Sequence, residues 1–213
     1  RVHLGSPDVD LDTHVSDIVN SIDYADLHDV ILVGHSYGGF PVTGAADVLC
    51  APGRPARLSR LVYVDSGPLP DGVSHLDTLG PERRDATLAA MKETDDGWRE
   101  PVPTWAEISA DPMNSPGLDE ARWQRWMSRA TDQPLGANAQ PLHLTNDEGR
   151  NALPHVLVSC VFPLDQVHAM VAAGHPFFTG FGGKDWTYVE LPTCHWPMFS
   201  EPARLAEILD DMG

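Results

Sequence analysis

The chain has few basic residues and no long apolar run. Its 213 residues include 14 lysines and arginines against 31 aspartates and glutamates, which gives a formal net charge of -17 at pH 7. A surface of that sign repels phosphate backbones and anionic lipid headgroups, so nucleic acid is not expected as a partner. No apolar run approaches the length needed to span a bilayer, and no membrane insertion is expected.

Cysteines are also scarce, and the three present are widely spaced: Cys50, Cys160 and Cys194. An odd, scattered set fits neither a disulfide framework nor a CxxC metal site. It favours a reducing compartment, so we expect a cytoplasmic protein. No two of the ten histidines have the H-x-x-x-H or H-E-x-x-H spacing of a zinc site. We therefore expect neither a metal ion nor an organic cofactor.

The sequence does contain an alternation of helical and strand-like segments. This order favours an α/β fold with a mostly parallel sheet flanked by helices over a β-sandwich. The first apolar run, Val30–Val33, is continuous and β-branched, which predicts a strand buried on both faces. The other predicted strands are Leu61–Val64, His155–Val161 and Trp186–Leu191. The predicted flanking helices are Thr13–Leu27, begun by Asp12 or Thr13, Phe40–Cys50 and Ala203–Met212.

Between the second and third predicted strands lies a proline-rich segment of a different kind. It has short helical stretches at Pro81–Lys92 and Leu118–Ala130 and no further predicted strand. We interpret residues 67–151 as a cap inserted into a core of residues 1–66 and 152–213, one domain in all. Four tryptophans of this cap either line an apolar pocket or pack the cap onto the core: Trp98, Trp105, Trp123 and Trp126. Of these, we assign Trp126 to substrate binding.

A G-x-S-x-G motif, Gly34-His35-Ser36-Tyr37-Gly38, follows the first predicted strand and precedes a helix. In that setting a sharp turn strains the serine backbone and lifts its hydroxyl above the sheet, which predicts Ser36 as a nucleophile. Glycine is expected at both flanks because a side chain there would collide with the neighbouring strand and helix. The backbone N–H of Tyr37 is placed to donate to an oxyanion, and His35 is predicted to form a pocket wall. The alternative, a phosphate-binding turn, lacks both the G-x-G-x-x-G fingerprint and the lysine of a P-loop.

A serine nucleophile needs a general base, and the base needs an acid to orient it. His195 is the predicted base because it follows the last predicted strand and precedes the C-terminal helix. Two aspartates compete for the third role. Asp65 directly follows the second predicted strand, at the same sheet edge as Ser36, whereas Asp165 lies close to a helix start, where it can serve as a cap. We prefer Asp65 and keep Asp165 as the alternative.

Three segments resemble the esterase and hydroxynitrile-lyase-like group of α/β-hydrolases, of the actinobacterial type: VILVGHSYGG (Val30–Gly39), LVYVDSGPLPDG (Leu61–Gly72) and LPTCHWPMFSEP (Leu191–Pro202). The resemblance implies an α/β-hydrolase fold with an inserted helical cap, with Ser36 as nucleophile and His195 as base. The aspartate that the family usually carries after the third predicted strand is missing. Haloalkane dehalogenases and some lipases carry their acid after the strand that follows the nucleophile, and Asp65 matches that location.

The family also begins with several strands and an H-G-x-W-like loop that supplies a second oxyanion donor, and neither precedes Arg1. Residues Arg1–Asp12 resemble the loop that follows those strands. An unpaired hydrophobic nucleophile strand would expose its edge to solvent. We therefore predict an upstream segment, or a partner chain, that completes the sheet. A homodimer is left open by the sequence.

Together these features predict a serine hydrolase that cleaves a small apolar ester or thioester through an acyl-enzyme. A first alternative is a lyase or cyclase in which the same three residues only move protons, acting on a cyanohydrin-like or polyketide-like compound. A second alternative is a non-catalytic α/β-hydrolase that uses its pocket to bind a small molecule. Labelling of Ser36 by a fluorophosphonate distinguishes the hydrolase from the binding protein.

Overall fold

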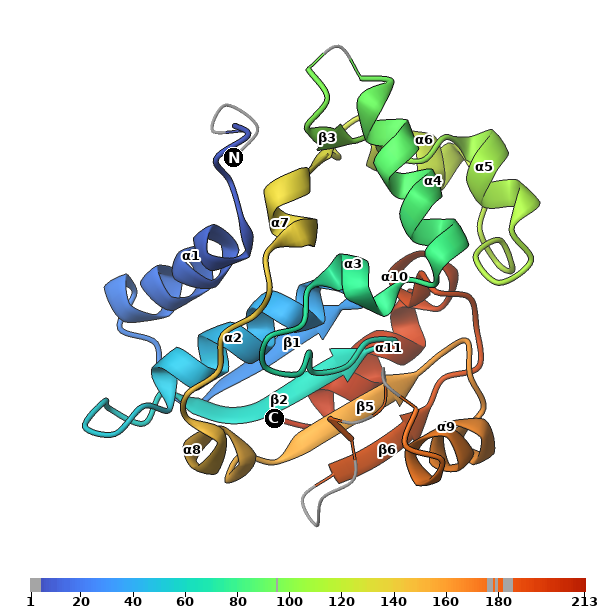
Figure 1. The fold of residues 1–213 in the computed structure, drawn as a ribbon. Helices are drawn as coiled ribbons and strands as arrows, with labels where there is room; N and C mark the ends of the chain where they lie inside the picture. The colour runs from blue at the N-terminus through green and yellow to red at the C-terminus, as the bar shows by residue number, and fades with distance from the viewer. Residues whose placement is uncertain (1–4, 95, 176–177, 179, 182–185) are drawn as a thin grey trace.

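A sheet of four parallel strands forms the centre of the computed structural model (Figure 1). The strands are β1 (Val30–His35), β2 (Leu58–Val64), β5 (His155–Ser159) and β6 (Trp186–Glu190), and they lie in the order β1-β2-β5-β6. Parallel neighbours need a crossover connection, and the helix between β1 and β2 supplies the first one. The predicted α/β fold with a parallel sheet is confirmed. The structure describes residues 5–94, 96–175, 178, 180–181 and 186–213.

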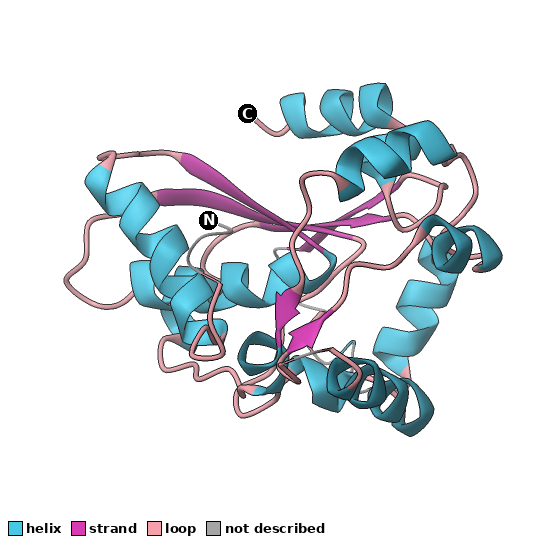
Figure 2. Ribbon diagram, turned by 90° about the horizontal axis from the view of Figure 1, so that it is seen from above, coloured by secondary structure: helices cyan, strands magenta, loops and turns pink. Residues whose placement is uncertain are grey.

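Helices cover both faces of this sheet (Figure 2). On one face lie α1 (Leu11–Tyr24), α2 (Gly39–Leu49) and α9 (Leu164–Ala172), and on the other lies α11 (Pro202–Asp210). Successive strand residues point to opposite faces, so the continuous apolar stretch Leu61–Val64 of β2 contributes to both cores. Its residues in the first core are Leu61 and Tyr63, and those in the second are Val62 and Val64.

The first helix begins and ends earlier than its sequence predicts. Asp10, rather than Asp12 or Thr13, caps α1, because its carboxylate accepts from the Thr13 backbone N–H at 2.8 Å and the Thr13 hydroxyl completes a capping box. The helix stops at Tyr24 rather than Leu27, since Asp26 adopts a φ of 49° that a right-handed helix cannot contain. Among the described residues, no helix combines the length and the apolar composition that crossing a bilayer requires.

The prediction that the first strand is buried on both faces is wrong. No side chain of Val30–Val33 is fully buried, and Val33 is 40% exposed. The reason is that β1 stands at the end of the strand order, with β2 as its neighbour in the described part of the chain. A β-branched run cannot distinguish a central strand from an edge strand. That a further segment or chain pairs with this edge stays a prediction.

Between β2 and β5 the chain leaves the sheet and forms short helices, of which α4, α5 and α6 lie at one end of the molecule (Figure 1). These helices are α3 (His75–Thr78), α4 (Pro81–Lys92), α5 (Trp105–Ala110), α6 (Glu120–Met127), α7 (Leu135–Ala139) and α8 (Asp147–Asn151). The α4 helix has its predicted bounds, whereas α6 begins later than predicted because Asp119 caps it, and it ends earlier, at Met127. The expectation of no strand here is wrong, since β3 (Arg99–Glu100) and β4 (Gln133–Pro134) form a short antiparallel pair. Two-residue strands are too short to show a period. The division into core and cap stays a prediction.

A buried ion pair ties the last part of this segment to the core. Asp47 of α2 accepts from Arg150 of α8 at 2.5 Å, and the two side chains are 4% and 9% exposed. The same carboxylate accepts from the backbone N–H groups of Thr145 and Asn146, each at 2.9 Å. A buried charge needs this full set of partners, so the pair fixes where the chain re-enters the sheet.

Candidate active site

Ser36 occupies the tight turn between β1 and α2. Residues Ser36–Gly38 form one turn of 3-10 helix, η2, and α2 begins at the next residue. The φ of Ser36 is 52°, in the left-handed region that costs a non-glycine residue roughly 1 to 3 kcal/mol. The predicted strained turn is confirmed. Ser66 supports it by donating its hydroxyl to the Ser36 carbonyl oxygen at 2.5 Å, a contact across 30 residues for which the sequence analysis assigned Ser66 no role.

The glycines around Ser36 serve close packing, but not as predicted. A Cβ at Gly34 would lie 2.7 Å from the Gly38 carbonyl oxygen, so this flank needs glycine as expected. At Gly38 a Cβ would meet nothing within 4 Å, so the predicted collision there is wrong. The second demanding position is Gly39, where a Cβ would lie 2.2 Å from Ser66 Oγ. Gly34 is therefore packed against Gly38, and Gly39 is packed against Ser66, two residues after the end of β2.

Three side chains from distant parts of the sequence form a continuous hydrogen-bonded chain. His195, in the loop between β6 and α10 (Pro197–Ser200), has its Nε2 2.8 Å from Ser36 Oγ and its Nδ1 2.5 Å from Asp65 Oδ2. The carboxylate only accepts, so Nδ1 carries the hydrogen and Nε2 of the neutral ring is free to accept the Ser36 hydroxyl proton. The Asp65 side chain is 8% exposed and that of His195 25%. The structure thus brings together the three predicted residues in the geometry of a catalytic triad.

Asp65 is held in place by backbone donors. It follows β2 directly with a φ of 44°, the second left-handed residue of the site. Its Oδ1 accepts from the N–H groups of Cys160 at 3.0 Å and Val161 at 3.1 Å. These two residues turn toward the aspartate, so β5 ends at Ser159 rather than at the predicted Val161. Burial raises the pKa of Asp65, but the hydrogen bond and charge of His195 and the two N–H donors outweigh it, so the pKa lies below its usual range.

The alternative acid lies outside this arrangement. Asp165 is exposed in the first turn of α9, and its Oδ1 accepts from the backbone N–H of Gln166 at 2.7 Å. Asp165 lies at a helix start as expected, but the suggestion that it caps the helix is wrong, because Pro163 occupies the N-cap position and no side chain caps α9. The geometry therefore favours Asp65 as the partner of His195.

The two residues beside Ser36 in the motif point in different directions. His35 Nε2 lies 2.6 Å from the carbonyl oxygen of His195, a contact that sequence analysis did not anticipate. The Tyr37 hydroxyl lies 2.9 Å from His14 Nδ1 and 3.3 Å from the Ala137 carbonyl oxygen, so it ties α1 and α7 to the turn. Burial raises the pKa of Tyr37 and keeps this hydroxyl neutral. The oxyanion role of the Tyr37 N–H stays a prediction.

An aromatic cluster joins the α6 helix to the loop that carries His195. Trp196 lies 5.6 Å from the His195 ring, 5.2 Å from Trp123 and 5.4 Å from Trp126, measured between ring centroids. Trp123 is 1% exposed and donates its Nε1–H to the Pro103 carbonyl oxygen, and its ring packs α6 against Trp196 of the loop that carries His195. Trp126 is half-buried beside it, and its assignment to substrate binding stays a prediction.

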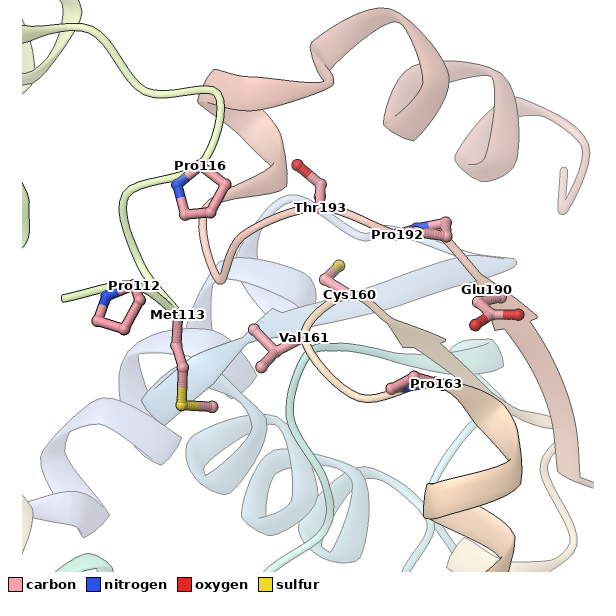
Figure 3. A pocket seen from close by; sticks show the side chains of 9 residues that line it. All are labelled: Pro112, Met113, Pro116, Cys160, Val161, Pro163, Glu190, Pro192 and Thr193. Atoms are coloured by element: carbon pink, nitrogen blue, oxygen red, sulfur yellow. The ribbon is translucent and has the colours of Figure 1, made fainter.

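A cavity of about 390 Å³ lies where the chain leaves β5, and the side chains that line it are labelled in Figure 3. Cys160 and Val161, whose N–H groups hold Asp65, form part of its wall. Its other lining residues are Pro112, Met113, Pro116, Pro163, Glu190, Pro192 and Thr193. Because Ser36 does not line it, this cavity is not the place where the serine would meet a carbonyl carbon. In the described part of the chain, no group of three or more histidine, cysteine or acidic side chains is placed to hold a metal ion.

Comparison with known proteins agrees with this geometry. The model of the alpha/beta hydrolase family matches residues 1–208. The chain is 30% identical over 233 residues to the carbendazim hydrolyzing esterase of Nocardioides sp. (strain SG-4G), an alignment that covers 100% of this chain and 83% of the relative.

Solved structures resemble the fold at lower identity. An extracellular alpha/beta-hydrolase from a Paenibacillus species, described as homologous in structure and function to tobacco salicylic acid binding protein 2, has a TM-score of 0.75 at 19% identity. That match covers 98% of this chain and 81% of the other. A pyrethroid hydrolase from Sphingobium faniae JZ-2 has a TM-score of 0.54 at 20% identity, covering 95% and 77%. At these identities the structures show a shared fold.

Proposed function

Because the chain belongs to the alpha/beta hydrolase family, we propose that it is a serine hydrolase that cleaves a small ester or thioester with an apolar acyl or alcohol part. The observation that carries the proposal is the hydrogen-bonded chain from Ser36 through His195 to Asp65, set on a strained turn at the end of β1. The similarity to an esterase along the whole chain supports an ester as the substrate. The aromatic cluster around Trp196 supports an apolar one.

The reaction proceeds in two halves. Ser36 Oγ attacks the carbonyl carbon while His195 Nε2 accepts the hydroxyl proton, and Asp65 stabilises the imidazolium that forms. The Tyr37 backbone N–H donates to the oxyanion, a contribution of about 3 kcal/mol in comparable sites. His195 then gives its proton to the leaving alcohol or thiol. A water molecule, deprotonated by the same ring, attacks the acyl-enzyme and releases the acid and free Ser36.

The proposal is tested by labelling with a fluorophosphonate and by hydrolysis of 4-nitrophenyl butyrate. Wild-type protein is expected to take up one label and to release nitrophenolate. Ser36→Ala is expected to abolish the label and to lower kcat by about 1,000-fold or more, as removal of the nucleophile does in other serine hydrolases. The matched control is Ser109→Ala, an exposed serine on α5 whose hydroxyl donates to its own helix. A folded wild-type protein that takes up no label contradicts the proposal and supports the binding-protein alternative.

A further inference from the structure

His35 contacts the main chain of the residue that we propose as the general base. Its Nε2 lies 2.6 Å from the carbonyl oxygen of His195, although 160 residues separate the two in sequence. A carbonyl oxygen only accepts, so Nε2 of His35 carries the hydrogen and donates it. The bond joins the last residue of β1 to the loop between β6 and α10, directly beside the serine that His195 must reach.

The rest of that loop is held at positions on either side of His195. The backbone N–H of Leu191 donates to Ser159, and that of Thr193 donates to Cys160, at 2.9 and 3.3 Å. Ser200, which follows His195 in the chain, is joined to Thr193, because its Oγ accepts from the Thr193 hydroxyl at 2.7 Å. These contacts fix the ends of the loop, whereas the His35 bond fixes the main chain of His195 itself. A displacement of about 1 Å in a catalytic group can cost 100-fold in rate, so this restraint falls where it matters most.

The uncharged form of His35 suits this role, because it donates the hydrogen bond without placing a second positive charge beside His195. Its ring centroid lies 4.8 Å from that of His195 and 5.4 Å from that of Trp196, so a charge on it would lie beside the imidazolium formed during catalysis. Burial, together with the nearby His195, lowers the pKa of His35 to about 4, against the opposing effects of its hydrogen bond to the His195 carbonyl oxygen and of the Asp65 carboxylate. The titratable groups that face it are thus His195 and Asp65. At neutral pH His35 donates a hydrogen bond without repelling the base.

We infer that His35 is a positioning residue, whose Nε2–H holds the His195 main chain so that His195 Nε2 meets Ser36 Oγ. The inference rests on the proposed function, because it assigns a task to His35 only if His195 takes the serine proton. It differs from the predicted role as a pocket wall, in which the shape of His35 would matter and its hydrogen bond would not.

The test compares three substitutions in the full chain. His35→Gln keeps an uncharged N–H donor the same number of bonds from Cα, His35→Leu removes the donor, and His35→Asn keeps an amide that is one bond too short. We expect His35→Leu and His35→Asn to lower two rates about tenfold: kcat on 4-nitrophenyl butyrate and the rate of fluorophosphonate labelling. A tenfold change is the size expected for the loss of one ordinary hydrogen bond. KM should stay within twofold of wild type. His35→Gln should recover both to within about threefold. His168→Leu, an exposed histidine on α9, is the matched control and should behave as wild type.

The outcomes separate the two claims. If His35→Leu or His35→Asn keeps kcat within twofold, or if folded His35→Gln is as slow as His35→Asn, the positioning role is wrong while the serine hydrolase stands. If His35→Leu does not fold, the comparison of His35→Gln with His35→Asn still decides. A rise in KM with unchanged kcat would support a pocket wall instead and overturn the inference. If neither wild type nor any variant takes up the label, the proposed function itself fails.

Discussion

The most informative single substitution is Asp65→Asn, because the structure dictates how the new amide must point. In the wild type, Oδ1 accepts two backbone N–H groups and Oδ2 accepts the His195 Nδ1–H. An amide nitrogen facing two N–H donors would be repelled, so the amide oxygen stays with Cys160 and Val161. The NH₂ group must then face His195 Nδ1 and donate to it. The ring hydrogen moves to Nε2, and the ring can no longer accept a proton from Ser36.

The expected loss follows from that change of tautomer. Fixing the wrong tautomer of a triad histidine costs about 10,000-fold in kcat, or about 5.5 kcal/mol of transition-state stabilisation. Folding should change much less, because the two backbone donors keep an oxygen partner. Thermal unfolding of Asp65→Asn is therefore expected within a few degrees of wild type.

Single-turnover and steady-state hydrolysis of 4-nitrophenyl butyrate measure this effect, with Asp165→Asn as the matched control. Asp165 is exposed and accepts from the adjacent backbone N–H, so its substitution should leave kcat within about twofold. The reasoning is refuted if Asp65→Asn retains more than a tenth of wild-type kcat, or if Asp165→Asn produces the large loss.

Three further predictions concern the turn, the core and pH. Gly34→Ala should abolish labelling because its Cβ would lie 2.7 Å from a backbone oxygen, whereas Gly38→Ala, with nothing within 4 Å, should be tolerated; labelling rates compare them. Asp47→Ala removes the buried partner of Arg150 and leaves this guanidinium with only the exposed Asp147, so it should cost about 3 to 5 kcal/mol in urea unfolding. The matched Asp147→Ala keeps the buried pair and should cost under about 1 kcal/mol. Burial lowers the pKa of His35 from 6.5 to about 4, so the unfolded chain binds the extra proton as pH falls between these values. The free energy of unfolding should therefore fall by up to about 3 kcal/mol between pH 6.5 and pH 4. In urea unfolding, the free energy of His35→Gln should fall less over this pH range than that of the wild type.

Local signals in the sequence were sufficient for the fold class and for two of the three proposed catalytic residues. The motif around Ser36 predicts its strained turn, because strand, glycine and helix are consecutive along the chain. The position of His195 identifies it among ten histidines for the same reason. It lies between the last predicted strand and the last predicted helix, and these are consecutive along the chain. Where a signal was short, as for the two-residue strand Arg99–Glu100, prediction failed.

What only the tertiary structure decided are the contacts between segments far apart in sequence. The choice of Asp65 over Asp165 depends on which carboxylate comes within 2.5 Å of His195 Nδ1, a pairing across 130 residues. The support of the turn by Ser66 and the hydrogen bond from His35 to the His195 carbonyl oxygen are likewise long-range. Periodicity and turn chemistry act over a few residues, so they predict which groups stand at the carboxyl ends of the strands. Packing of the whole sheet then determines which of those groups meet, and in which orientation.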